Sequence, residues 1–496
     1  MIKEKKLFFG FSKIQLFQVV LLYSVAHIGI FFSLNGYFWD DYTLVGTPDF
    51  EILQLFREAG TFLNLTGWLH VNLLKFGPWV YKFLTFFLFL FSGLLLNTIL
   101  IKYDKNYNEK YRLYFVIIFL LFPFYLVKPA LIMMPYTVSL FLFFLAWSFI
   151  DRARLFALIL FFLSFNVQSF LVFFLVPFLE LYYRKFSDNL TIKTFIEFSL
   201  RHLFYILLPF VFFGIKIFYF RPFGNYSGYN ENFSLINLFS APYQMLISFF
   251  STFYSYLAII FIIVCVFYVF GINFKLPFIR EQRKNLFLGF FLILLACFPY
   301  WIIGLAPTFY EWSSRHLLLV PLGVSLLVSA FIFSTHVRIR KYLFTVVVAI
   351  SIFINLKTYI EFYLDWDKQN QLVLLFHNDS NIKNRNLFFI TDNTINAIER
   401  KYRYYEWNGL FSRSFLDESR FGLDKNDYLV DNVYKYLNKE NSDLSGFDSF
   451  FNLKHSKAKQ FIENREVLPT QIQINYKKRV NGFPILPKYS ITTHVD

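Results

Sequence analysis

Long apolar segments constrain the fold of this chain more than any other feature of its sequence. Several of them, such as 79–101 and 342–362, exceed the roughly 18 residues that a helix needs to cross about 30 Å of hydrocarbon. Only 16% of the 496 residues are charged, whereas about a quarter are charged in a typical soluble domain. The sequence therefore predicts an all-α polytopic membrane protein.

The pattern of charged residues predicts the membrane topology of the chain. About nine full spans are expected, at 14–34, 79–101, 112–128, 133–150, 201–220, 246–271, 286–304, 316–335 and 342–362. Alternate connections between them are basic, at 102–112, 151–154, 182–193, 280–285 and 336–341. Because short Lys/Arg-rich connections stay in the cytoplasm, we expect a multi-pass protein of the inner or plasma membrane with a cytoplasmic N-terminus.

Net charge and cysteine content exclude other classes of protein. The net charge of +15 follows from the basic cytoplasmic connections, so it does not indicate a nucleic-acid partner. The 73 phenylalanines carry no functional weight, since Phe in a lipid-facing helix is simply an apolar residue. Cys265 and Cys297 both fall inside apolar segments, which makes them poor candidates for a disulfide framework or a metal site.

The segment 155–181 does not fit the pattern of full spans. It joins two basic connections but is too short to cross the bilayer twice. A re-entrant hairpin of two short helices that breaks at 164–169 keeps both basic ends inside. Non-helical backbone at that depth needs protein or a watery cavity around it, so we predict that 164–169, which includes Gln168, lines a cavity. The alternative is a single helix that is an exception to the charge rule.

The first outer connection, 35–78, is long and carries two adjacent aspartates, Asp40 and Asp41, directly after Trp39. Residues 49–60 place apolar side chains on one helical face, which predicts an amphipathic helix along the membrane surface. Taken alone, the acid pair is more simply explained as a helix cap and an interfacial charge, and Trp39 fits an aromatic belt.

After the last span the sequence becomes charged and soluble in character. We expect residues 1–364 to form the membrane domain and 365–496 a small extracytoplasmic α/β domain. Residues 385–393 are typical of a buried strand, and 393–410 are helix-like. The tyrosine-rich stretch 402–410 suits a sugar-contacting patch or, as we favour, half-buried core.

Basic residues on the outer side are scarce by the charge rule, so those that occur there are candidates for binding an anion. For Lys82 we favour snorkelling to the interface, and for Lys216 and Arg221 that explanation is as good as a functional one. Arg315 and His316 open a predicted span, where a helix N-terminus favours anions. Several cations facing one cavity would suit a phosphate or diphosphate. The predicted substrate-binding residues are Arg315, His316, Lys216, Arg221, Lys128, Trp39, Gln168 and Glu311.

Together these features resemble the GT-C class of polytopic glycosyltransferases. The shared elements are an outer acid pair after the first span, a long amphipathic first connection, a mid-chain hairpin of short helices, outer cations and a C-terminal outer domain. Among them the chain looks most like bacterial members of the Gtr-type O-antigen glucosyltransferase group. It departs from many relatives in reading Gly60-Thr61 where they carry Gly-Arg.

The resemblance implies a polyprenyl-phosphate-linked sugar donor, a glycan or lipid acceptor and a lipid bilayer around the protein. It maps the catalytic carboxylate to Asp40 or Asp41 and the donor phosphate to Arg315. A positioned carboxylate can accept the proton of a sugar hydroxyl as the new bond forms, and a single displacement would invert the anomeric carbon. Since neighbouring side chains point opposite ways on an extended backbone, only one aspartate need face the acceptor, and we favour Asp40. Carboxylate oxygens suit divalent metals, but nothing in the sequence demands a metal or another cofactor.

Two other functions fit parts of the pattern. A polysaccharide polymerase or ligase with lipid-diphosphate donors has a similar number of spans but usually a large late outer loop, which is short here. A lipid-linked oligosaccharide transporter should show internal repeats and polar residues through several spans, and no clear repeat is visible.

Overall fold

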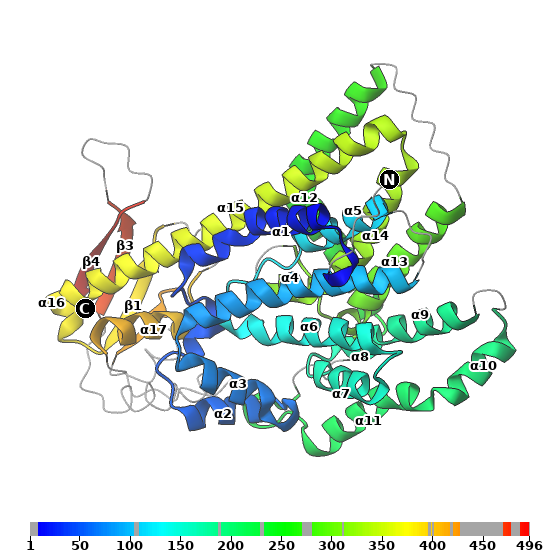
Figure 1. Ribbon diagram of the computed structural model, residues 1–496. Coiled ribbons are helices and arrows are strands. Elements are labelled where there is room, and N and C mark those ends of the chain that lie inside the picture. Colours follow the sequence, from blue (N-terminus) through cyan, green and yellow to red (C-terminus); the bar gives the residue numbers. More distant parts are fainter. Residues whose placement is uncertain are drawn as a thin grey trace.

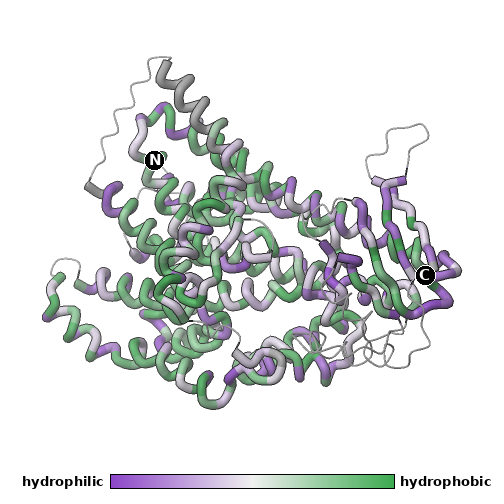
Figure 2. Tube along the Cα trace, turned by 180° about the vertical axis from the view of Figure 1, so that it is seen from behind, coloured by the Kyte–Doolittle hydropathy of each residue, from purple (hydrophilic) through white to green (hydrophobic). Residues whose placement is uncertain are grey.

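The computed structural model describes residues 8–103, 109–186, 190–228, 233–269, 280–309, 312–394, 398, 401–416, 420–426, 470–477 and 487–495. The molecule is mostly helical and carries a small sheet near its C-terminus, as the sequence predicts (Figure 1). Apolar residues dominate the helical bundle, and hydrophilic residues gather toward the C-terminal sheet (Figure 2).

The bundle consists of helices that follow the long apolar segments. Its helices are α1 (Lys13–His27), α4 (Pro78–Tyr103), α5 (Glu109–Leu121), α6 (Met134–Phe149), α7 (Arg154–Ser164), α8 (Ser169–Phe173), α9 (Leu175–Phe186), α10 (Ile192–Arg201), α11 (Leu203–Tyr219), α12 (Asn237–Val269), α13 (Arg280–Trp301), α14 (Val320–Ser334) and α15 (Val337–Asn378). Short 3-10 helices connect them: η1 (Phe8–Gly10), η2 (Ile28–Ser33), η5 (Leu131–Met133), η6 (Gly224–Tyr226) and η7 (Trp312–Leu317).

Within the described residues, five helical segments are long and apolar enough to cross a membrane, or six if the bent pair α10 and α11 forms one span. The predicted number of about nine full spans is therefore not confirmed. Two of the predicted spans are shortened by turns: α5 ends at Leu121, and α14 begins only at Val320, where Pro321 occupies the first turn. Proline suits that position because the first turn of a helix has no partner for its N–H groups.

The mid-chain hairpin breaks where the sequence predicts. Helix α7 ends at Ser164, α8 begins at Ser169, and the residues between them form turns. The tip is tied to the first connection, since the Asn166 amide donates to the Thr66 hydroxyl at 2.8 Å and accepts from the Phe62 backbone N–H at 3.3 Å. The backbone N–H groups of Asn166 and Val167 at the tip donate to the carbonyls of Leu163 and Ser164, so the non-helical backbone keeps partners inside the bundle.

The first connection folds against the bundle as two short helices, α2 (Asp49–Glu58) and α3 (Leu65–Leu74), with η3 (Trp39–Thr43) and η4 (Phe62–Asn64) before them. The predicted amphipathic helix is confirmed, because Ile52, Leu55 and Phe56 of α2 are all buried. Gly60 has a positive φ of 68°, and a Cβ there would lie 2.4 Å from the Phe220 carbonyl oxygen. Only glycine permits this close approach to the chain after α11.

The C-terminal unit contains a four-stranded sheet in the order β2-β1-β3-β4, with bounds β1 (Leu387–Asp392), β2 (Phe421–Asp424), β3 (Thr470–Tyr476) and β4 (Tyr489–Val495). Strand β1 pairs in parallel with β2 and β3, and β3 pairs antiparallel with β4. Short helices α16 (Ser380–Lys383) and α17 (Tyr404–Phe415) accompany it. The predicted buried strand is thus confirmed, while the predicted helix after it begins only at Tyr404.

The bundle and the sheet share one long helix. Helix α15 runs without a break from Val337 to Asn378, so the predicted boundary between residues 364 and 365 falls inside it. Its last turns contribute Leu372 and Phe376 to a core that also holds Trp407, Phe411 and Tyr42 of η3. The first connection and the C-terminal unit therefore pack together, at the end of the molecule opposite the N-terminus (Figure 1).

Candidate active site

A cavity of about 1150 Å³ lies between the first connection, the hairpin tip, α11, α13, η7 and the segment before α17. Of the predicted site residues, Asp40, Gln168, Arg315 and His316 line it. The cavity thus joins residues that are far apart in the sequence. Its volume exceeds that of most small-molecule sites, at roughly 300–1,000 Å³.

The two aspartates of η3 occupy opposite environments. Asp40 is partly exposed and lines the cavity, where one carboxylate oxygen accepts a hydrogen bond from the Tyr405 hydroxyl at 2.8 Å. Asp41 is completely buried. The backbone just before them is strained, since Trp39 has a φ of 51°, and strain of this kind in a non-glycine residue often accompanies functional sites.

Asp41 links η3 to the segment at η5 through buried hydrogen bonds. One of its carboxylate oxygens accepts from the backbone N–H groups of Phe38 and Leu131, both at 2.9 Å, and the other accepts from Ile132 at 3.0 Å. Burial raises the pKa of the Asp41 carboxyl to about 6, against the opposing effects of the Lys82 charge and the three backbone donors. A shifted pKa often marks a catalytic group, but here both oxygens are already engaged and Asp41 does not line the cavity.

Lys82 belongs to the same buried group. The snorkelling interpretation is wrong for this residue, because Lys82 is only 1% exposed and its ammonium donates to the Pro129 carbonyl. Together with Asp41 it fixes η3 against the turn that precedes η5 and α6. A buried lysine of this kind is stable only with such partners.

Arg315 lies in η7, ahead of α14, so it does not begin the α-helix as the sequence suggests. Its guanidinium stacks over the ring of Trp312, with the central carbon 4.5 Å from the ring centroid. Its Nε is buried and has no hydrogen-bond partner among the described residues. Stacking holds the guanidinium flat while leaving N–H donors available to an anion.

His316, next to Arg315, is not a cation at neutral pH. It is buried against Tyr300, with 4.3 Å between the ring centroids. Burial, and then the neighbouring Arg315 charge, lower the pKa of His316 well below its ordinary value. Its Nδ1 has no hydrogen-bond partner within the described parts of the chain. The neutral imidazole can therefore serve a bound molecule as a hydrogen-bond donor or acceptor.

Other predicted residues lie elsewhere. Trp39 is buried behind the cavity wall, 5.5 Å from Trp312 between ring centroids. Lys128 is buried with its ammonium over the ring of Phe89, Lys216 is part of α11, and Arg221 is exposed just after that helix. None of these three cations lines the cavity. Glu311 lies outside the described residues.

The C-terminal unit supplies site residues that the sequence does not reveal. Lys401 and Arg403 line the cavity, and Tyr405, in the first turn of α17, donates a hydrogen bond to Asp40. The stretch 402–410 is largely core, as we favoured, because Tyr402, Tyr405 and Trp407 are buried. Its tyrosine cluster was the only available signal, and nothing in the sequence connects it with a residue 365 positions away.

Metal binding finds no support in the described residues, where His, Cys, Asp and Glu side chains form no group of three that could hold an ion. Charge at this site comes instead from Asp40 and from the cations Arg315, Lys401 and Arg403.

Comparisons with protein-family models, with curated proteins and with solved structures gave no match.

Proposed function

We propose that this protein is a membrane glycosyltransferase that moves a sugar from a polyprenyl-phosphate donor to a cell-surface glycan or lipid. The observation that carries the proposal is the single cavity that joins the Asp40 carboxylate with the stacked guanidinium of Arg315. Such a transfer needs a base at one end of the reacting bond and a cation at the other.

The proposed reaction is one displacement at the anomeric carbon. An acceptor hydroxyl attacks that carbon while Asp40 takes the hydroxyl proton, and the bond from the anomeric carbon to the phosphate oxygen breaks. The electron pair leaves with the polyprenyl phosphate, whose growing charge Arg315 stabilises. The Tyr405 hydroxyl, 2.8 Å from Asp40, holds the carboxylate in one orientation. The product is inverted at the anomeric carbon.

The walls of the cavity suit a lipid-linked donor. Pro209, Phe210 and Phe213 of α11 line one side, and Phe298 and Pro299 of α13 line another. Phe210 and Phe213 are 69% and 49% exposed, so the same wall is continuous with the apolar surface of the bundle. A polyprenyl chain could lie along that wall with its phosphate toward Arg315.

The charge rule places the end of the molecule that holds the cavity and the C-terminal sheet on the extracytoplasmic side in this proposal. Helix α15 begins at the end of the molecule opposite the C-terminal sheet (Figure 1), and its first turns carry Arg338, Arg340 and Lys341. Positively charged ends are retained in the cytoplasm. We therefore propose that transfer takes place on the outer face of the inner or plasma membrane.

The decisive experiment measures sugar transfer from a panel of polyprenyl-phosphate hexoses by the purified protein in bilayers, with membranes of the producing organism as the acceptor. We expect at least one donor to be consumed, with release of polyprenyl phosphate, and Asp40→Asn to abolish that release. A matched control is Asp49→Asn, because Asp49 lies on the same connection but is largely exposed, pairs with Lys75 and does not line the cavity. Full activity of the Asp40 variant, or no transfer from any donor, would contradict the proposal.

A further inference from the structure

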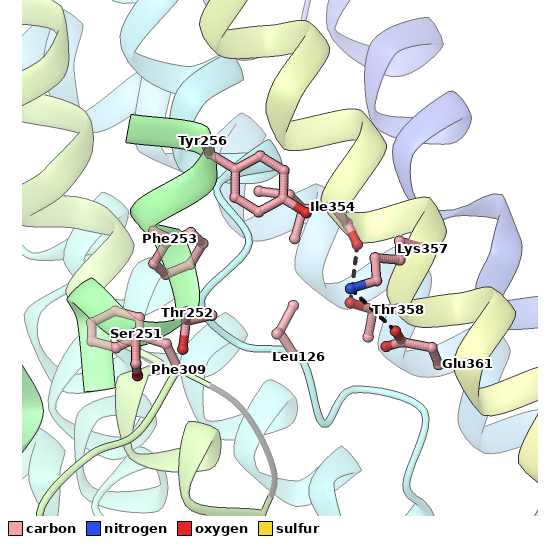
Figure 3. Close-up of a pocket in the computed structure, with 10 residues that line it drawn as sticks. All are labelled: Leu126, Ser251, Thr252, Phe253, Tyr256, Phe309, Ile354, Lys357, Thr358 and Glu361. Carbon is pink, nitrogen blue, oxygen red and sulfur yellow. Dashed lines mark hydrogen bonds and ion pairs between the residues drawn. The ribbon is translucent and has the colours of Figure 1, made fainter. Parts of the chain in front are cut away.

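A second cavity, of about 390 Å³, lies between α12 and α15. Leu126 and Phe309 close it on the side of the connections between helices. Figure 3 shows side chains of α12 and α15 on opposite sides of this space, with Leu126 between them and Tyr256 reaching toward α15. Among the described residues, none lines both this cavity and the one that contains Asp40.

The lining of the second cavity is unusually polar for a bundle of apolar helices. Helix α12 contributes the hydroxyl groups of Ser251, Thr252 and Tyr256. From α15 come Lys357 and Glu361, which form an ion pair with 3.5 Å between Nζ and Oε1. The Oγ1 atom of Thr252 is buried and has no hydrogen-bond partner among the described residues, although buried hydroxyls normally have one.

The surroundings of the cavity are those of a lipid-facing surface. Helix α15 is one of the candidate membrane spans, and α12 is an apolar helix that covers the predicted span as far as Val269. Both present exposed apolar side chains beside the cavity residues, such as Phe250 on α12 and Phe353 on α15. Ionisable side chains within such segments are costly and usually mark a functional site.

We propose that this cavity binds the head group of a zwitterionic phospholipid with the chemistry of phosphatidylethanolamine. Its phosphate would meet Lys357 and its ammonium Glu361, while the Thr252 hydroxyl would donate to an ester or phosphate oxygen. An anionic lipid would place its charge beside the Glu361 carboxylate, and a neutral glycolipid would leave the ion pair without a counterpart. The cavity volume is within the usual range for small-molecule sites, and the acyl chains would cover the exposed apolar residues.

The test compares lipid retention by the full-length protein, transferred to detergent with equal amounts of phosphatidylethanolamine, phosphatidylglycerol and diglucosyl diacylglycerol, and measured by native mass spectrometry. We expect phosphatidylethanolamine to be retained about tenfold over the others, as one charge-assisted hydrogen bond would give. Glu361→Gln should shift the preference toward phosphatidylglycerol, because Lys357 then lacks its carboxylate. Thr252→Val should lower retention severalfold without changing the preference.

A matched control is the double variant Asp49→Asn and Lys75→Gln, which removes an exposed ion pair on the first connection. It should retain lipid like the unchanged protein. Retention of phosphatidylglycerol or the glycolipid equal to that of phosphatidylethanolamine would overturn the proposal. So would unchanged retention in both Glu361→Gln and Thr252→Val, which would leave the ion pair as a surface feature only. Thermal unfolding of each variant separates loss of the lipid from loss of the fold.

Discussion

Asp40 and Asp41 are neighbours in the sequence, yet their side chains lie on opposite faces of η3. The face that carries Asp40 opens into the large cavity, where the Asp40 carboxylate accepts a hydrogen bond from Tyr405. The face that carries Asp41 is sealed and meets three backbone donors and the Lys82 charge. The comparison teaches that a perturbed pKa alone would select Asp41, which is the aspartate that does not line the cavity. A carboxylate whose oxygens are all engaged can hold a protein together but cannot take a proton from a substrate.

The strongest test of this difference is Asp40→Asn. We expect the rate of sugar transfer to fall roughly 100- to 10,000-fold, the usual contribution of a general base. The free energy of unfolding should change by no more than about 0.5 kcal/mol, because Asp40 is partly exposed and the amide oxygen can still accept from Tyr405. Transfer assays and thermal unfolding of the same preparation measure both. A variant that loses stability along with activity would count against the distinction between the two faces.

The converse change, Asp41→Asn, should act on stability. The amide offers one acceptor oxygen where the carboxylate offers two, and it leaves the Lys82 charge buried without its counterpart. We expect unfolding to become easier by about 3 kcal/mol, measured by denaturation in detergent. The fraction that remains folded should keep transferring sugar at a rate close to that of the unchanged protein. If its rate per folded molecule dropped as far as that of the Asp40 variant, both aspartates would be catalytic.

Arg315→Gln should weaken binding of the sugar donor while leaving the buried hydrogen bonds of Asp41 intact. Loss of hydrogen bonds to a charged phosphate predicts a rise in KM for the donor of about 10- to 100-fold. Arg57→Gln is a suitable control, because Arg57 is exposed on α2 and does not line the cavity. An equal rise in KM for both arginine variants would mean that donor binding depends only on the total positive charge around the cavity.

Tyr405→Phe removes the hydroxyl that donates to the Asp40 carboxylate on the cavity face of η3. We expect kcat to fall about three- to tenfold, the worth of one hydrogen bond, with the KM for the donor unchanged because Tyr405 positions Asp40 rather than the phosphate. Tyr404→Phe, at the neighbouring position of α17, provides the control. A change in KM alone would show that Tyr405 acts on the donor instead.

The smallest predicted effect is on the pH dependence of the free energy of unfolding, through the buried carboxyl of Asp41. Because burial raises the pKa of Asp41 to about 6, the folded protein keeps a proton there that the unfolded chain, with a carboxyl pKa near 4, has lost. The free energy of unfolding should therefore increase by about 1 kcal/mol through this group as the pH falls from 7 to 5. That increment should be absent in Asp41→Asn, and equal pH dependence of the two proteins would contradict it.

Much of the architecture was predictable because the bilayer imposes simple rules. The long apolar segments predicted the helices, and the basic connections favoured a hairpin with a break near 164–169 over a single helix; the structure has that break. The amphipathic helix of the first connection and the buried strand β1 were also read correctly from periodicity. The predicted number of about nine spans is not confirmed among the described residues, because apolar composition continues through turns such as the one after Leu121, where the helix ends.

The sequence by itself determined long apolar helices that could span a membrane and an acid pair near an amphipathic helix, since apolar length and charge patterning are properties of single segments. Only the tertiary structure decided which aspartate faces the cavity, which cations join it, and that residues from 401 to 405 complete it. These outcomes depend on contacts between segments hundreds of residues apart. Local sequence cannot specify such contacts, because the same acidic side chain is catalytic or structural according to what packs against it.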